Sequence, residues 1–317
     1  MEAKEMMDIG IGDLIPGVEL PIDVYVLIGS GNYIQVAKKG TKTNLQDLHV
    51  TEKQADLRLY IKKTEYSLVV DVNSKVANLL LKRPDLPLDY KIHFLKTTMR
   101  STFRQLTEFG FDEKLFVQSK GTVSALVGMV QKKEEHFALI EVLHDLPGHL
   151  VKNSVAVASL SVLIGKVLGW QAPVLEKLAM GALFRDVGLS LLPEALLQKR
   201  RADMSALERM TYETHPKKSA EILRRIPGFP SEGVLIAMEH HENSIGQGFP
   251  HKSHDFAQNP LAKVVALADL FIDLTLPPTG DEPKTTEQAV HFIESALGLP
   301  FNRSVFLALK KAFEIRH

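Results

Sequence analysis

From Lys75 to its end, the chain is an almost unbroken series of apolar segments with the periodicity of α-helices. Apolar residues recur at mixed spacings of three and four, which is typical of amphipathic helices. Prolines separate the segments, and proline ends a helix because it lacks an amide N–H and clashes with the preceding turn. We expect helices at about 89–109, 115–130, 137–143, 150–168, 173–187, 205–226, 232–243, 260–275, 285–297 and 301–315.

The first quarter of the chain has a different pattern, with short β-branched and apolar runs. The turn residues at 29–32 separate two of these runs and predict a β-hairpin. Thr51 and the following residues resemble a capping box and predict a short helix. The expected strands are 23–28, 33–36, 57–61 and 68–70.

These two patterns predict the domain organisation. We expect a small β-rich α+β domain at residues 1–74, with an accessory or regulatory role. Connecting helices are expected at 75–142, and an all-helical bundle at 143–317.

Composition excludes several classes of protein. The 317 residues carry 38 basic and 38 acidic side chains, and this balance argues against general nucleic-acid binding. The absence of cysteine excludes disulfides, thiolate zinc sites and cysteine nucleophiles. A charged amino end predicts no signal peptide, and the lack of 18 consecutive apolar residues predicts no membrane span. We therefore expect a cytoplasmic protein.

Histidine and aspartate interrupt several of the apolar helices. The chain has 12 histidines, and seven of them lie between His144 and His254. Asp186, His215, the pair at 240–241 and Asp269 fall in four separate helical segments. Facing helices build metal sites from such inward residues, and aspartate with histidine suits iron, manganese or zinc. Each residue taken singly is more often a cap, a surface group or a satisfied core polar group. Neighbouring histidines on a helix also point about 100° apart.

The order of these residues resembles the HD-GYP domain, a branch of the HD phosphohydrolase superfamily. The resemblance covers about residues 150–275, and its first core helix contains Asn153. Further blocks match the family's His-Asp-x-Gly-Lys, His-Pro, His-His-Glu with Gly-Tyr-Pro, and Ala-Asp motifs. These blocks are Phe184–Gly188, Thr214–Pro216, His240–Pro250 and Leu267–Asp269. His144-Asp145 is a literal His-Asp pair outside these blocks, and we read it as part of a turn or helix end.

The resemblance implies an all-helical domain that binds two or three metal ions, commonly iron, and hydrolyses cyclic di-GMP. It also implies two ligand sets that share Asp186. One ion would use a first-helix histidine, both members of the His-Asp pair and Asp269. The other would use Asp186 with His215, His240 and His241.

Only the second set is complete in this chain. At six positions that the family uses for ligands, phosphate contacts or motif residues, other residues stand here. These positions are His149, Asn153, Arg185, Leu189, Ile245 and Phe249. Asp269 survives, but in a depleted ligand set. Because arginine is a permanent cation whose fork matches carboxylates, we predict that Arg185 replaces the first ion and bridges Asp269, with Asp186 as an optional second partner.

Two functions remain open on these residues. The first is a degenerate HD-GYP-like signalling protein, an inactive relative of metal-dependent cyclic di-GMP phosphodiesterases that acts as a binding or protein-interaction module. It would hold at most one iron, manganese or zinc ion, or none, and would bind cyclic di-GMP or another signalling protein. The alternative is a phosphohydrolase that works with a single metal and uses Arg185 to stabilise phosphate. No oligomeric state is predicted.

Overall fold

The computed structural model describes residues 3–15, 17–28, 31–42, 58–81, 83, 85–131, 133–143, 149–277 and 282–315. The predicted helix near Thr51, part of the 29–32 turn and the His144-Asp145 pair lie outside these ranges. The chain forms two compact units. Residues 1–110 and 117–125 make the N-terminal unit, and residues 111–116 and 126–317 make the C-terminal unit. The three-part division expected from the sequence stays a prediction.

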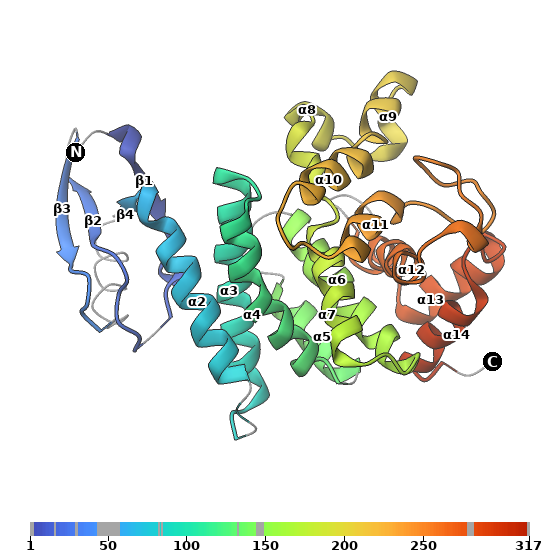
Figure 1. Cartoon of the computed structure of the whole chain (residues 1–317), viewed down its shortest axis with the longest axis horizontal. Helices are drawn as coiled ribbons and strands as arrows, with labels where there is room; N and C mark the ends of the chain where they lie inside the picture. The colour runs from blue at the N-terminus through green and yellow to red at the C-terminus, as the bar shows by residue number, and fades with distance from the viewer. Residues whose placement is uncertain are drawn as a thin grey trace. The chain divides into compact units, whose positions relative to one another are not determined.

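The N-terminal unit contains an antiparallel sheet of four strands among the described residues (Figure 1). The strands are β1 (Met6–Ile9), β2 (Val24–Ile28), β3 (Asn32–Ala37) and β4 (Leu59–Lys62). Their order in the sheet is β1-β4-β2-β3. The predicted hairpin is confirmed, since β2 pairs with β3 and Val26 lies opposite Ile34.

The strand predicted at 68–70 is wrong. These residues lie inside helix α2 (Tyr66–Leu81). Its buried positions include Tyr66, Val69, Val70, Asn73 and Ala77, which are spaced by one, three or four residues. That spacing places them on one helical face. A short apolar triplet fits both the strand and the helix period, so the longer pattern decides the outcome.

Two more helices contribute to the N-terminal unit. Helix α3 (Leu88–Phe109) packs against α2. Helix α4 (Glu113–Met129) begins after Asp112, whose side chain accepts a hydrogen bond of 2.7 Å from the amide of Leu115. The middle of α4 belongs to this unit, and its two ends belong to the C-terminal unit.

Helices are the main secondary structure of the C-terminal unit, whose described residues also include loops and an isolated β-bridge between Ile245 and His254. Its helices are α5 (Lys133–Leu143), α6 (His149–Val167), α7 (Ala172–Phe184), α8 (Glu194–Leu197), α9 (Ala206–Tyr212), α10 (His215–Arg224), α11 (Ser231–Glu239), α12 (Pro260–Thr275), α13 (Thr286–His291) and α14 (Arg303–Ala312). The predicted fold class, a helical bundle with a small N-terminal β-rich part, is confirmed.

Three predicted helices differ from their expected bounds, and each difference matters for the site. The helix expected at 232–243 ends at Glu239, before the histidine pair. The helix expected at 173–187 ends at Phe184, and a 3₁₀ turn (Val187–Leu191) follows. The helix expected at 205–226 is divided into α9 and α10, which begins at His215. In all three places a helix terminus, rather than a helix interior, presents the polar residue.

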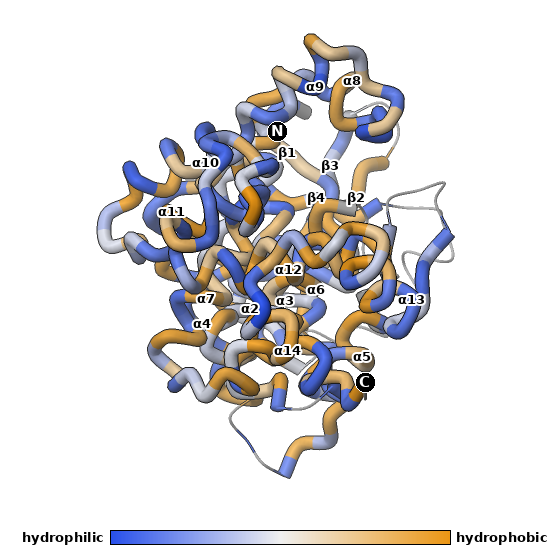
Figure 2. The backbone as a smooth tube through the Cα atoms, turned by 90° about the vertical axis from the view of Figure 1, so that its right-hand side faces the viewer, coloured by the Kyte–Doolittle hydropathy of each residue, from blue (hydrophilic) through white to orange (hydrophobic). Residues whose placement is uncertain are grey.

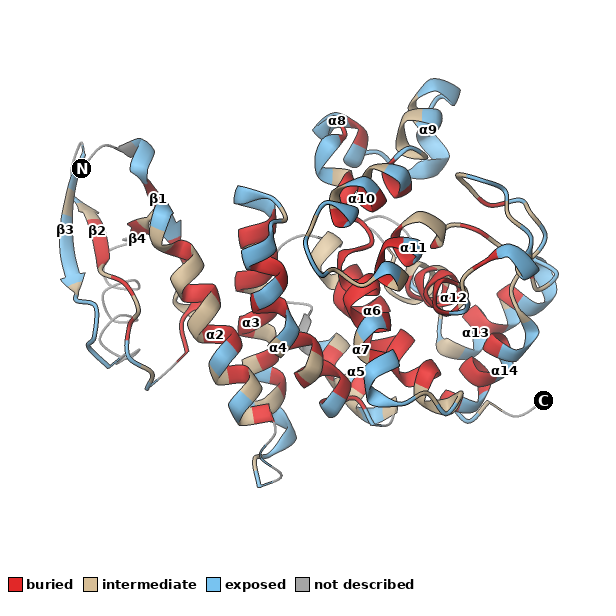
Figure 3. Cartoon of the chain, in the orientation of Figure 1, coloured by how far each residue is buried: buried red, intermediate tan, exposed pale blue. Residues whose placement is uncertain are grey.

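Helices α6, α7 and α12 form the centre of the C-terminal unit. Figure 3 shows long buried stretches along them, and Figure 2 shows that α12 is largely hydrophobic. Helix α6 is long and apolar enough to cross a membrane by length and composition, but 72% of its window Leu150–Val167 is buried inside the fold. That burial is typical of a core helix.

Candidate metal centre

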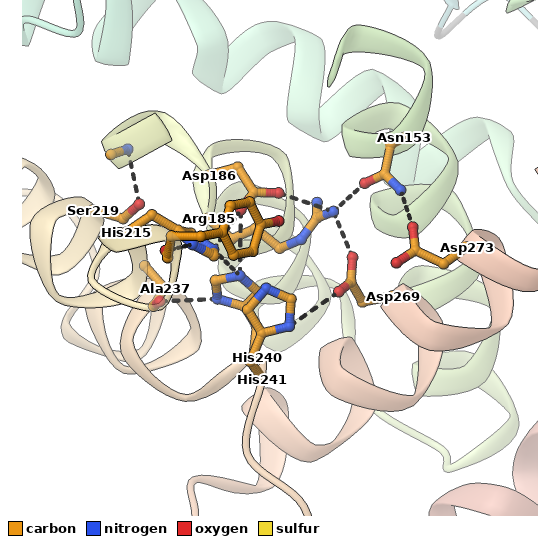
Figure 4. Close-up of polar contacts among 12 residues, drawn as sticks. Asn153, Arg185, Asp186, His215, Ser219, Ala237, His240, His241, Asp269 and Asp273 are labelled. Atoms are coloured by element: carbon orange, nitrogen blue, oxygen red, sulfur yellow. Dashed lines mark hydrogen bonds and ion pairs between the residues drawn. The ribbon is translucent and has the colours of Figure 1, made fainter. Parts of the chain in front are cut away.

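The candidate site lies where helix termini meet the middle of α12 (Figure 4). Asp186 directly precedes the 3₁₀ turn after α7, and His215 is the first residue of α10. His240 and His241 follow the end of α11, whereas Asp269 lies within α12. Because His240 and His241 follow a helix end, regular helical geometry does not force their side chains apart.

Gly188 allows the turn that carries Asp186 to pack directly on α10. The amide of Gly188 donates a 2.8 Å hydrogen bond to Ser219 Oγ. A Cβ atom at position 188 would lie 2.5 Å from the carbonyl oxygen of His215, which is closer than real Cβ contacts come. The close approach therefore requires glycine, and it holds Asp186 beside His215.

A second close approach fixes the segment that carries His241. A Cβ atom at Gly248 would lie 2.3 Å from the His241 carbonyl oxygen. The buried carboxylate of Glu242 accepts hydrogen bonds from the amides of His251, at 2.6 Å, and Ser253, at 2.9 Å. These contacts anchor the loop after the histidine pair.

We call Asp186, His215, His240 and His241 the histidine side of the site. Among the described residues, each of these four offers a ligand atom, and the four atoms lie within 4.8 Å of one another. The Nε2 atoms of His215 and His240 each lie 3.3 Å from Asp186 Oδ1 and 3.3 Å from each other. This is a compact set of three nitrogens and one carboxylate.

Backbone carbonyls set the tautomers of His215 and His240. Nδ1 of His215 lies 2.7 Å from the Tyr212 carbonyl oxygen, and Nδ1 of His240 lies 2.9 Å from that of Ala237. Because a carbonyl only accepts, each Nδ1 carries the proton and donates it. In the neutral rings, Nε2 therefore presents a lone pair towards Asp186 Oδ1.

These lone pairs and the carboxylate oxygen repel one another unless a cation lies among them. A proton is disfavoured on His215, because burial lowers the pKa of this imidazole even though Asp186 opposes the shift. Burial, together with His240, also holds the pKa of His241 well below its usual range. Neutral imidazoles oriented by a second hydrogen bond are the usual histidine ligands of metals. The histidine side therefore fits iron, manganese or zinc.

We call Asn153, Arg185, Asp269 and Asp273 the arginine side. Arg185 is 0% exposed, and its Nη2 lies 2.7 Å from Asp269 Oδ1 and 3.1 Å from Asp186 Oδ2. The predicted bridge between the two carboxylates is confirmed. The same Nη2 donates to Asn153 Oδ1, and Nη1 donates to the carbonyl of Ala182 at 2.9 Å.

The charged groups on the arginine side shift one another's pKa. Burial disfavours the charged guanidinium, but Asp186 and Asp269 outweigh it and raise the pKa of Arg185. Burial likewise opposes ionisation of Asp186, yet the Arg185 guanidinium holds the pKa of this carboxyl well below its usual range. Burial and the Asp269 carboxylate raise the pKa of Asp273 to about 7.

Two contacts complete the arginine side. Asn153 Nδ2 donates a 3.0 Å hydrogen bond to Asp273 Oδ1. Asp269 Oδ2 lies 3.5 Å from His241 Nδ1 and so joins the two sides (Figure 4). The amide of Asn153 therefore links Arg185 to a second carboxylate, which a histidine at this position would not do in the same way.

The remaining predicted positions lie around the site with different surroundings. Leu189 packs against the apolar cluster of Leu192, Leu196 and Met204. The Phe249 ring lies 4.5 Å from that of His241, centroid to centroid. Ile245 is 47% exposed and pairs with His254 through an isolated β-bridge. His149 begins α6, and its side chain lies outside the described part of the structure.

Sequence reasoning missed three residues at the site. Asp273 lies one turn after Asp269 on α12, and this spacing of two acids in an apolar helix could have revealed it. Tyr212 and Arg201 precede α10, and only the folded chain brings them close to the histidines. Their sequence carries no comparable signal.

Comparison with known proteins identifies the family. The family model of the HD domain matches residues 138–305, which is more than half of the chain. The chain belongs to the HD domain family. The predicted assignment to HD-GYP or HD-domain proteins is thereby confirmed.

Two known proteins resemble this HD-domain chain. The first is the cyclic di-GMP phosphodiesterase response regulator RpfG of Xanthomonas campestris pv. campestris (strain 8004), which is 28% identical over 141 residues. That match covers 44% of this chain and 37% of the length of RpfG. The second is the structure of Bd1817, a HDG"Y"P protein from Bdellovibrio bacteriovorus, with a TM-score of 0.70 at 17% identity. It covers 98% of this chain and 99% of Bd1817, and it shows a shared fold.

Proposed function

We propose that this HD-domain protein is a degenerate HD-GYP-like signalling protein with at most one metal ion. It acts as a binding or protein-interaction module without efficient cyclic di-GMP phosphodiesterase activity. One observation carries the proposal: the fully buried guanidinium of Arg185 bonds Asp269 and Asp186, which an ion on the arginine side would need as ligands.

The magnitude of the charge repulsion supports a single ion. Two unit charges of equal sign at 4 Å repel by about 4 kcal/mol at the effective dielectric constant of 20 typical of proteins, and a divalent ion doubles this. A second ion beside Arg185 would also compete for the carboxylates that now neutralise the guanidinium. The charge of Arg185 therefore opposes a metal ion on the arginine side.

The histidine side would hold the one ion through Asp186, His215, His240 and His241. When bound, such an ion supplies a Lewis-acidic positive charge for a phosphate oxygen. The chain's own groups prepare this side. The carbonyls of Tyr212 and Ala237 hold the proton on Nδ1, so that each Nε2 is free to bind.

The complete histidine side favours a second candidate, a phosphohydrolase that works with a single metal. The alternative predicted from the sequence uses Arg185 to stabilise phosphate. The burial of Arg185 and the engagement of both its Nη atoms argue against that role. A single-metal enzyme would need another cation near the ligand.

The ligand and the domain roles form part of the same proposal. The partner of this chain would be cyclic di-GMP or a signalling protein. RpfG is a cyclic di-GMP phosphodiesterase response regulator, and this similarity supports cyclic di-GMP. We assign residues 1–74 an accessory or regulatory role, with 75–142 as connecting helices and 143–317 as the HD-GYP-like domain. We also propose a cytoplasmic location.

Metal analysis combined with an activity assay tests the proposal. The full chain is supplied with iron or manganese, its metal content per chain is measured, and hydrolysis of cyclic di-GMP is followed. We expect no more than one ion per chain and no efficient turnover. Two tightly bound ions would contradict the one-ion claim. Metal-dependent turnover that Asp186→Ala abolishes would favour the single-metal enzyme.

A gain-of-site variant sharpens this test. The double substitution Asn153→His and Arg185→His removes the buried cation and supplies two imidazoles beside Asp269. We expect the metal content to rise from one ion towards two. The single substitution Asn153→His is the control, because it leaves Arg185 in place, and its metal content should stay at one.

A further inference from the structure

An exposed arginine lies beside the histidine side and has no part in the interactions described so far. Arg201 begins the 3₁₀ turn Arg201–Asp203. Its Cζ atom lies 5.0 Å from the centroid of the Tyr212 ring and 5.7 Å from that of Phe249. Two aromatic rings therefore support one guanidinium.

Both supporting rings rest on metal-ligand rings. The Tyr212 ring lies 4.8 Å from His215, and the Phe249 ring lies 4.5 Å from His241, measured between centroids. Arg201 is thus separated by one aromatic layer from two different residues of the histidine side.

The charge of Arg201 is not neutralised within the part of the chain that the structure describes. No carboxylate there forms an ion pair with it, whereas its neighbour Arg200 pairs with Asp203 at 2.8 Å. Contact with aromatic rings orients a guanidinium but leaves its charge and its N–H donors available. A free, oriented fork next to a metal-ligand set is suited to an anion.

We propose that Arg201 is a phosphate-binding residue for a phosphate or phosphate ester held at the histidine side. The proposal rests on the proposed function, because it requires the ion on that side. Two other positions could have been expected to contact phosphate, Arg185 and the motif position Leu189. Arg185 is buried against its carboxylates, and Leu189 packs in an apolar cluster, so neither offers this contact. The planar fork of arginine matches two phosphate oxygens at once.

The test measures binding of inorganic phosphate to the full chain loaded with manganese, by calorimetry. A charged hydrogen bond contributes enough that we expect Arg201→Gln to weaken phosphate binding about 10- to 100-fold. Arg200→Gln is the matched control, because it removes the same charge one residue away, and it should leave the affinity unchanged. Arg201→Lys should fall between Arg201→Gln and the wild type, since it keeps the charge but not the fork.

Manganese binding, measured separately, distinguishes a failure of the Arg201 proposal from a failure of the metal site. We expect Arg201→Gln to bind manganese as tightly as the wild type. If manganese binds but phosphate does not, or if both glutamine variants lose affinity equally, the role of Arg201 is overturned and the metal site stands. If the wild type binds no manganese, the ion that the proposed function allows on the histidine side is absent, and the role of Arg201 is overturned with it.

Discussion

The two sides of the site solve the same electrostatic problem in opposite ways. Each contains buried carboxylates that need positive charge. On the arginine side a guanidinium that belongs to the chain supplies it, at 2.7 Å from Asp269. On the histidine side two Nε2 lone pairs face Asp186 Oδ1 at 3.3 Å, whereas Arg185 contacts the other oxygen, Oδ2, and in our proposal an exchangeable ion supplies the positive charge among these atoms.

This difference separates stability from ligand binding. A fixed cation stabilises the fold whatever the metal supply, but it cannot bind and release a ligand. An exchangeable ion makes the stability depend on its concentration and leaves coordination positions for other groups. In the proposed function, Arg185 in place of one ion keeps the buried carboxylates neutralised and leaves a single ion for metal chemistry.

The largest effect is expected from Arg185→Met, which removes the fixed cation and keeps a similar length. Breaking a buried ion pair by removal of one partner costs about 3–5 kcal/mol, because the other charge stays buried without compensation. Here Asp186 and Asp269 both lose their partner. Chemical denaturation with and without manganese would measure the free energy of unfolding.

The control for this variant is Arg200→Met on the exposed surface. Its ion pair with Asp203 is solvent-exposed, and water screens such pairs so that they contribute little to stability. A cost below about 1 kcal/mol for Arg185→Met would mean that the arginine side does not stabilise the fold as a unit.

Metal removal should give the next largest effect, confined to the histidine side. A ligand present at 100 times its dissociation constant stabilises the folded state by about 2.7 kcal/mol. We expect manganese to raise the free energy of unfolding by this amount relative to chelated protein, and His215→Ala to abolish the increase. His251→Ala, on the exposed loop, should retain it. An equal response of both variants would contradict the assigned ligand set.

A pH dependence of intermediate size should come from the arginine side. The pKa of Asp273 is raised from the ordinary 3.8 to about 7, so the folded state prefers the protonated carboxyl. Its contribution to stability is complete below the ordinary pKa and is lost as the pH rises through about 7. Asp186, whose pKa is lowered, behaves oppositely, and its contribution is lost only in more acidic solution.

The isosteric variant Asp273→Asn isolates this titration. Between about pH 5 and pH 7.5, the wild type should lose on the order of 2 kcal/mol of stability relative to the variant. Urea denaturation of both proteins in the presence of a chelator measures the difference without interference from metal binding. A difference that stays flat, or that grows in favour of the wild type, would show that Asp273 is ionised throughout.

The sequence predicted the components of the site better than their setting. Asp186 could be found because it interrupts an apolar segment, and His215, His240 and His241 because they lie in blocks that match the family's motifs. Arg185 could then be paired with Asp269 by charge. The helix ends were harder to predict. The sequence placed Asp186 inside a helix, whereas that helix ends at Phe184. That end depends on the packing of Gly188 against Ser219, a contact between segments 31 residues apart.

The same limit explains the errors elsewhere. At 68–70, local residue preference favoured a strand, whereas the face that α2 buries makes it a helix. Arg201 and Phe249 are separated by many residues, and only the folded chain brings the guanidinium and the ring together. Positions set by a periodic pattern are predictable, and contacts made by tertiary packing are not.

The smallest effect is expected from Ser219→Ala, and it should be restricted to one side of the site. Ser219 Oγ accepts the hydrogen bond of the Gly188 amide at 2.8 Å, in a fully buried position. Loss of such a bond costs about 1 kcal/mol. Because this bond ties the turn after Asp186 to α10, we also expect manganese affinity to fall several-fold. Ser190→Ala is the matched control, since its hydroxyl donates to Val187 within the same turn and does not reach α10.

The contacts of Arg185 with Asn153 and Asp269 come from α6 and α12, so the pH dependence of Asp273 should persist in Ser219→Ala. If Ser219→Ala changed that pH dependence as much as it changed manganese binding, the two sides would form one coupled network, and the contrast between an exchangeable and a fixed cation would not hold.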